Sequence, residues 1–90
     1  MRESEIEKKS VAAAKKLSWY SFKLLSTLVR GLPDRVFIGH GRIIFIEYKT
    51  ATGKLSPIQQ RIHAIFAEHG ITVHVARSVE DTIRILYDVK

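Results

Sequence analysis

Cysteine is absent from this 90-residue sequence, which excludes disulfide bonds and thiolate metal sites. No apolar run approaches the roughly 18 residues that a membrane-spanning helix needs. The N-terminal segment also lacks the apolar stretch of a secretory signal peptide. From these absences we expect a cytoplasmic protein without a membrane partner.

The residues that are present suffice for one small domain spanning 1–90. Hydrophobic residues make up 46% of the chain, which is ordinary for a globular core and too high for a disordered segment. The formal net charge is +6, and the basic residues are spread along the chain rather than gathered in one tail. A basic balance favours a polyanionic partner such as DNA, because neutralised phosphates release condensed counterions.

Periodic apolar residues predict seven elements in the order α-β-β-β-α-β-α, which implies an α/β fold with a mixed central sheet flanked by helices. The expected ranges are a helix over 3–17, strands over 18–25, 35–38 and 42–49, a helix over 56–70, a strand over 71–76 and a last helix from 78. The segment Gly39-His40-Gly41 is typical of a hairpin loop. Strand 42–49 is apolar on both faces, which favours a central position. The aromatic residues of 18–25 are expected to pack within the sheet.

Two acidic residues and a lysine fall where the predicted sheet brings them together. Side chains alternate along a strand, so Glu47 and Lys49 share one face while Tyr48 takes the other. Asp34 opens the neighbouring strand, and the hairpin folds it back toward Glu47. An acid and a lysine at the end of an apolar central strand are costly unless they have a function.

These residue types in this arrangement suit a metal-dependent hydrolase. Two carboxylates held close repel each other, and a hard divalent cation such as Mg²⁺ relieves that repulsion. Asp34 and Glu47 would be its ligands, together with the backbone carbonyl of Tyr48. Such a cation lowers the pKa of a bound water and contacts a scissile phosphate. Lys49 could orient or deprotonate that water, or stabilise the charge that develops on the phosphate.

The same residues stand in a pattern that resembles the PD-(D/E)XK nuclease signature, and more closely its VRR-NUC branch. The resemblance rests on four segments in the family's order, which together cover nearly the whole chain: Arg2-Glu3-Ser4-Glu5-Ile6-Glu7, Gly31-Leu32-Pro33-Asp34, Ile44-Phe45-Ile46-Glu47-Tyr48-Lys49 and Gly53-Lys54-Leu55-Ser56-Pro57-Ile58-Gln59. A lone Glu-x-Lys carries little information, whereas this ordered set is specific. The resemblance implies a PD-(D/E)XK restriction-endonuclease-like core.

The resemblance also implies phosphodiester hydrolysis with Mg²⁺ or Mn²⁺ as the cofactor. Asp34 and Glu47 match the family's metal ligands, Lys49 its catalytic lysine and Gln59 its motif glutamine. Glu3 matches an acidic metal ligand on the first helix. Small stand-alone members are mostly phage-related, would act in the host cytoplasm, and resemble dimeric Holliday-junction resolvases.

We therefore expect a homodimeric endonuclease that cuts branched or four-way-junction DNA. A 90-residue chain is near the size at which one core is marginal, so a partner subunit would help. Cutting a symmetric junction also needs two active sites related by a two-fold axis. One alternative is a monomeric flap or branched-DNA nuclease on the same fold. The other is a non-catalytic DNA-binding or assembly module, which the intact acid pair and lysine disfavour.

Some of these residues have structural explanations as well. Asp34 after a proline could be a turn residue, and Glu47 with Lys49 could be an exposed ion pair. Gln59 stands three residues after Ser56, a spacing typical of a capping box at a helix start. For Gln59, capping and active-site support are both open from the sequence.

Charged residues around the predicted site leave further alternatives. Glu3 and Glu7 lie four apart on the core-facing side of the first helix, where each could be a ligand or could complement the positive helix N-terminus. Lys23 and Arg30 flank the predicted site and are candidates for phosphate contacts, with solvated surface charge as the alternative. Four histidines show no metal-site spacing and are expected in turns, in the core or on the surface: His40, His63, His69 and His74.

Overall fold

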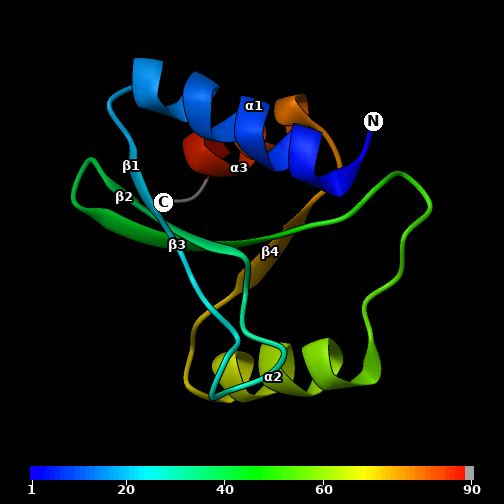
Figure 1. Cartoon of the computed structure of the whole chain (residues 1–90). Helices are drawn as coiled ribbons and strands as arrows, with labels where there is room; N and C mark the ends of the chain where they lie inside the picture. The colour runs from blue at the N-terminus through cyan, green and yellow to red at the C-terminus, as the bar shows by residue number, and fades with distance from the viewer. Residues whose placement is uncertain (89–90) are drawn as a thin grey trace.

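A computed structural model describes residues 1–88 as seven elements in the predicted order (Figure 1). They are α1 (Glu3–Lys16), β1 (Tyr20–Lys23), β2 (Arg35–Gly39), β3 (Arg42–Tyr48), α2 (Pro57–Glu68), β4 (Val73–Ala76) and α3 (Val79–Asp88). Within the described residues, no helix is both long and apolar enough to cross a membrane. The predicted order is confirmed, and the largest difference in bounds is at β1, which is shorter than expected.

The four strands form one mixed sheet in the order β1-β2-β3-β4. β1, β2 and β3 are antiparallel neighbours, whereas β4 pairs with β3 in parallel after the crossover through α2. β3 is hydrogen-bonded on both sides, so the prediction of a central strand is confirmed. α1 and α3 lie on one face of the sheet and α2 lies on the other (Figure 1).

A two-residue turn, His40-Gly41, joins β2 to β3. Both residues have positive φ, 51° at His40 and 75° at Gly41. Positive φ at both central positions is the signature of a type I′ turn, whose twist matches that of the flanking strands. The turn is therefore tighter than the three-residue loop expected from the sequence.

The hairpin register sets the position of the acidic residues. Arg35, the first residue of β2, is paired with Ile46 of β3. Continuing that antiparallel register by one residue brings Asp34 level with Glu47. The tight turn thus places two residues that are far apart in the sequence at the same end of the sheet.

The face covered by α1 and α3 carries the hydrophobic core. The buried apolar residues of this cluster are Ile6, Ala14, Trp19, Phe37, Ile44, Ile46, Tyr48, Ala76, Ile85 and Leu86. A polar chain also crosses this core: the Tyr48 hydroxyl lies 3.1 Å from Thr82 Oγ1, and Thr82 donates to Ser10 Oγ at 2.9 Å. Each of these hydroxyls has a partner, so the chain ties β3 to both helices while the hydrogen bonds offset the cost of burial.

β1 differs from its expectation in both length and packing. It covers only Tyr20–Lys23, and it is an edge strand, because it pairs with β2 on one side alone. Trp19, just before β1, is buried as expected and its ring lies 5.1 Å from that of His40. Tyr20 and Phe22 are 63% and 50% exposed, so the prediction that they pack in the sheet is wrong. By their register with Ile38 and Val36, their side chains lie on the α2 face, where the two rings stand 5.0 Å apart.

The α2 face of the sheet is only partly covered, because it carries a single helix. Phe66 of α2 packs edge-on against Phe45 of β3, with ring centroids 5.2 Å apart. Within α2 itself no residue is fully buried, and Ile58 and Ile65 are about two-fifths exposed. Away from α2, a row of apolar side chains crosses three adjacent strands in the open: Tyr20, Ile38 and Ile43.

Candidate active site

Asp34 extends the β2–β3 ladder with its side chain. Its Oδ2 accepts a hydrogen bond from the backbone N–H of Tyr48 at 2.7 Å. The carboxylate therefore takes the place of a backbone acceptor beyond the end of β2. Since the N–H and C=O of one strand residue point to the same side, the Tyr48 carbonyl also faces Asp34.

Glu47 is buried beside Asp34, with only 1% of the residue exposed. It lies two residues after Phe45, which packs against α2, so its side chain is on the α2 face as well. Burial raises the pKa of the Glu47 carboxyl from 4.5 to about 8, and the charge of Asp34 and a hydrogen bond with it add to that rise. Lys49 lowers the same pKa and Glu3 raises it, so both groups lie within electrostatic range of the carboxyl. The predicted meeting of the acid pair and the lysine is present in the fold.

Lys49 follows the last residue of β3 and is 9% exposed. Its backbone N–H continues the sheet by donating to the Ala76 carbonyl at 3.0 Å. Arg77 holds the loop that follows, because its Nη1 donates to the carbonyls of Thr50 and Gly53 at 2.7 Å each. These contacts fix the backbone on both sides of the lysine, which limits the positions its ammonium can reach.

Gln59 combines the two roles that the sequence left open. Its backbone N–H donates to Ser56 Oγ and its Oε1 accepts from the Ser56 N–H, at 3.2 and 2.9 Å, which completes a capping box. Its remaining amide group, Nε2, donates to Glu47 Oε2 at 3.1 Å. One side chain thus starts α2 and holds the buried acid.

Gly31 allows the loop before Asp34 to lie against the start of α2. Its φ is 84°, and a Cβ at this position would come within 2.5 Å of Ile58 Cγ2 and 2.9 Å of the Ile58 carbonyl oxygen. Only glycine fits both the backbone conformation and the space. This close approach brings Asp34 and the first turn of α2 to the same end of the molecule.

His63 belongs to the site, although the histidine spacing in the sequence did not indicate it. It lies one turn after Gln59 on α2, and its Nε2 is 3.8 Å from Glu47 Oε1. Burial and the charge of Lys49 lower the pKa of His63, which favours the neutral imidazole. The available signal was the four-residue spacing from Gln59, which puts both side chains on one helix face.

The acids of α1 have different surroundings. Glu7 is buried and accepts from Arg35 Nε at 2.7 Å, and Lys23 Nζ lies 3.6 Å from the same carboxylate. Glu3 is exposed and close enough to Glu47 to raise its pKa. The structure therefore places Glu7 and Lys23 in an ion-pair cluster and leaves Glu3 as the acid of α1 nearest the site.

Arg30 lies at a hollow that opens beside the acid pair. The hollow has a volume of about 250 Å³, and its lining includes Arg30, Asp34, Ser56 and Gln59. Arg30 is exposed. An exposed guanidinium at the rim of an acidic site is well placed for a phosphate that approaches it.

The donor set at this site suits a hard divalent cation. Glu47 Oε1 is buried and has no hydrogen-bond partner in the part of the chain that the structure describes. Two adjacent carboxylates and the Tyr48 carbonyl are oxygen donors of the kind that Mg²⁺ prefers. No group of three or more acidic or histidine side chains forms a full cage among the described residues. Mg²⁺ commonly takes only one or two carboxylates and completes its shell with waters and phosphate oxygens, so two suffice.

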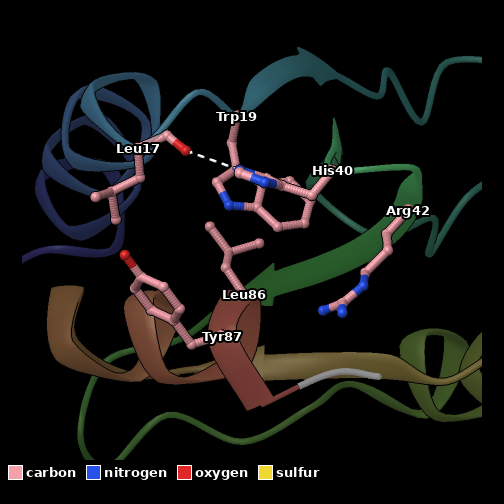
Figure 2. A pocket seen from close by; sticks show the side chains of 6 residues that line it. All are labelled: Leu17, Trp19, His40, Arg42, Leu86 and Tyr87. Carbon is pink, nitrogen blue, oxygen red and sulfur yellow. Dashed lines mark hydrogen bonds between the residues drawn. The ribbon is translucent and has the colours of Figure 1, made fainter.

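A second hollow, of about 210 Å³, lies at the hairpin end of the sheet (Figure 2), and Glu47 is not among its lining residues. Its lining residues are Leu17, Trp19, His40, Arg42, Leu86 and Tyr87. His40 Nε2 is 3.0 Å from the Leu17 carbonyl oxygen, so its ring is used to hold the turn against α1 (Figure 2). This lining contains no carboxylate, unlike the hollow that Asp34 lines.

The mixed sheet and the acidic pair with its lysine define a PD-(D/E)XK nuclease core. The model of the VRR-NUC domain family matches residues 4–80, and the chain therefore belongs to the VRR-NUC family of nucleases. The chain is 42% identical to "Putative nuclease p44" of Acyrthosiphon pisum secondary endosymbiont phage 1 over an aligned segment of 65 residues. This segment covers 71% of this chain and 70% of the phage protein. A solved structure described as "VRR_NUC domain" matches with a TM-score of 0.85 at 26% identity, over 98% of this chain and 97% of that one. The expected family and fold class are confirmed.

Proposed function

We propose that this chain is a Mg²⁺- or Mn²⁺-dependent endonuclease that hydrolyses phosphodiester bonds of DNA in the cytoplasm. The observation that carries the proposal is the contact between two carboxyl groups, Asp34 and Glu47, next to a buried lysine. Keeping both carboxyls ionised in a buried site costs free energy, and a bound divalent cation offsets that cost. The nuclease family and the phage nuclease relative support the same reaction.

Each side chain then has a distinct role. Asp34 and Glu47 would hold the cation together with the Tyr48 carbonyl, and Glu3 is the candidate acid from α1. When bound, the cation would supply a water of lowered pKa and neutralise charge on the phosphate. Lys49 places an ammonium beside the acid pair, where it can orient the attacking water or stabilise charge that develops on the phosphate oxygens.

Substrate binding is assigned to basic groups around the site. Arg30 at the rim of the hollow is the candidate for a phosphate contact, and the net charge of +6 provides further non-specific attraction. Lys23 Nζ is paired at 3.6 Å with Glu7, but its side chain is 58% exposed and can still meet a phosphate. We therefore expect recognition of DNA shape and phosphate position rather than of base sequence.

The specific substrate that we propose is a four-way junction or similarly branched DNA, cut by a homodimer. The exposed apolar row Tyr20, Ile38 and Ile43 supports the dimer, because contiguous exposed apolar surface marks protein–protein contacts. A two-fold dimer can present two active sites to the symmetry-related strands of a junction. Linear duplex offers no such pair of sites, so junctions are expected to be cut faster.

A cleavage panel of duplex, flap, fork and four-way-junction DNA with Mg²⁺ or Mn²⁺ tests this function. Asp34→Ala, Glu47→Ala and Lys49→Ala should each abolish cleavage while DNA binding in gel-shift assays remains. Lys16→Ala, which removes an exposed lysine at the end of α1, is the matched control and should cleave normally. Cleavage at the wild-type rate by Lys49→Ala would refute the assignment of the site. DNA binding without cleavage at any metal concentration would support the non-catalytic module instead.

Sedimentation mass tests the dimer separately. The wild type should sediment as a dimer at micromolar concentration, and Ile43→Glu should shift it to a monomer with an unchanged far-ultraviolet circular dichroism spectrum. A monomeric wild type that cuts flaps as fast as junctions would refute the resolvase proposal and favour a monomeric flap nuclease.

A further inference from the structure

Two side chains from successive turns of α2 face the same buried carboxylate. Gln59 Nε2 donates to Glu47 Oε2 at 3.1 Å, and His63 Nε2 stands 3.8 Å from the other oxygen, Oε1. The side chains of His63 and Glu47 are 13% and 2% exposed. The pair is therefore shielded from water, and the helix approaches Glu47 at two points rather than one.

The contact at the second point is incomplete. Among the described residues, the buried side-chain polar atoms without a hydrogen-bond partner are Glu47 Oε1 and His63 Nε2, which face each other. Leaving such an atom unsatisfied costs about 1–3 kcal/mol, and more when it is charged. A separation of 3.8 Å exceeds a hydrogen bond by somewhat under 1 Å, which a small rotation of either side chain closes.

The chemistry of the two atoms fits a donor and an acceptor that lack only each other. A carboxylate oxygen is a strong acceptor for an imidazole N–H. His63 can donate an N–H from Nε2 to that oxygen in either its neutral or its charged form.

We propose that His63 is a positioning residue for the metal site, which donates its Nε2–H to Glu47 Oε1 while Gln59 holds Oε2. The two donors fix the plane of the carboxylate and leave a second lone pair on each oxygen for the cation. This inference rests on the proposed metal-dependent function and deepens it. Partners behind a metal ligand typically contribute 10- to 100-fold in metal affinity.

The experiment measures metal binding by the whole chain without DNA. Free Mn²⁺ is counted by electron paramagnetic resonance during titration, and Mg²⁺ is measured by its displacement of Mn²⁺. His63→Ala should weaken both metals by about 10- to 100-fold, and to a similar extent. His63→Gln, whose amide nitrogen takes the place of Nε2, should restore affinity to within about three-fold of the wild type. His69→Ala, which removes the exposed histidine at the end of α2, is the control and should bind normally.

The outcomes separate this proposal from the proposed function. A wild type that binds neither metal overturns the metal-dependent function itself. If the wild type binds metal and His63→Ala binds it with equal affinity, only the positioning role is overturned. Loss of Mn²⁺ with retention of Mg²⁺ in His63→Ala also overturns it, because that pattern marks a nitrogen ligand of the metal rather than a hydrogen-bond donor. If His63→Ala fails to fold, His63→Asn is used in its place. The shorter asparagine amide should not restore metal affinity, whereas the glutamine amide of His63→Gln should. Equal metal affinities of these two variants would overturn the proposal.

Discussion

Replacing Glu47 with glutamine is expected to stabilise the metal-free protein at alkaline pH while abolishing cleavage. In the folded protein, burial and the neighbouring Asp34 raise the pKa of Glu47 from 4.5 to about 8. Between these two values the folded protein keeps a proton that the unfolded chain has lost. Stability therefore falls as the pH rises through this window, and a glutamine, which cannot ionise, escapes the loss.

The size of the effect follows from the width of that window. Each pH unit between the two pKa values is worth about 1.4 kcal/mol, which gives an upper bound of about 5 kcal/mol. Local relaxation and water penetration weaken buried electrostatics, so we expect about 2 kcal/mol at pH 8. For a domain of this size, 1 kcal/mol moves the melting temperature by about 4–8 °C. The expected gain for Glu47→Gln is thus roughly 8–16 °C at pH 8 and close to zero at pH 5.

Thermal unfolding followed by circular dichroism in EDTA, from pH 5 to pH 8, measures this difference. Glu68→Gln, at an exposed position of α2, is the control and should change stability by less than about 0.5 kcal/mol at any pH. Added Mg²⁺ should raise the melting temperature of the wild type at pH 8 and leave Glu47→Gln unchanged. A difference between the two proteins that does not widen from pH 5 to pH 8 would refute the reasoning.

Three further predictions concern other residues of the site. Gln59→Glu keeps the capping box but replaces the amide donor at the buried Glu47 with another carboxylate. The cleavage rate should therefore fall at least about 100-fold while the helical circular dichroism signal stays unchanged. A wild-type cleavage rate would show that Gln59 acts only as a helix cap. Glu3→Gln should lower the cleavage rate at saturating DNA with little effect on the melting temperature. Glu7→Gln should lower the melting temperature, because it leaves Lys23 and Arg35 without their acidic partner. The reverse pattern would exchange the roles of the two acids. Arg30→Ala should weaken DNA binding to a similar extent for all sequences and reduce the salt dependence of binding by about one counterion. Fluorescence anisotropy measures both effects. An unchanged salt dependence would show that Arg30 does not contact a phosphate.

The sequence by itself determined the order of the elements and the identity of the acidic site. The apolar run within 42–49 indicated a strand that is apolar on both faces, and the glycines around His40 indicated the hairpin. With a hairpin in place, antiparallel pairing brings Asp34 toward Glu47 whatever the rest of the fold does. These features are local, because they depend on residues joined by one turn, and local periodicity predicts them well.

Only the tertiary structure decided which side chains from separate elements meet. The sequence offered capping or active-site support for Gln59, and the fold provides both contacts from one side chain. It could not separate Glu3 from Glu7, since both share a helix face; the approach of Arg35 from β2 ties up Glu7. Likewise, spacing alone did not connect His63 with the carboxylate on β3. Periodicity defines the face on which a residue lies, but the partner across that face depends on how α1 and α2 pack on the sheet, which is a non-local property.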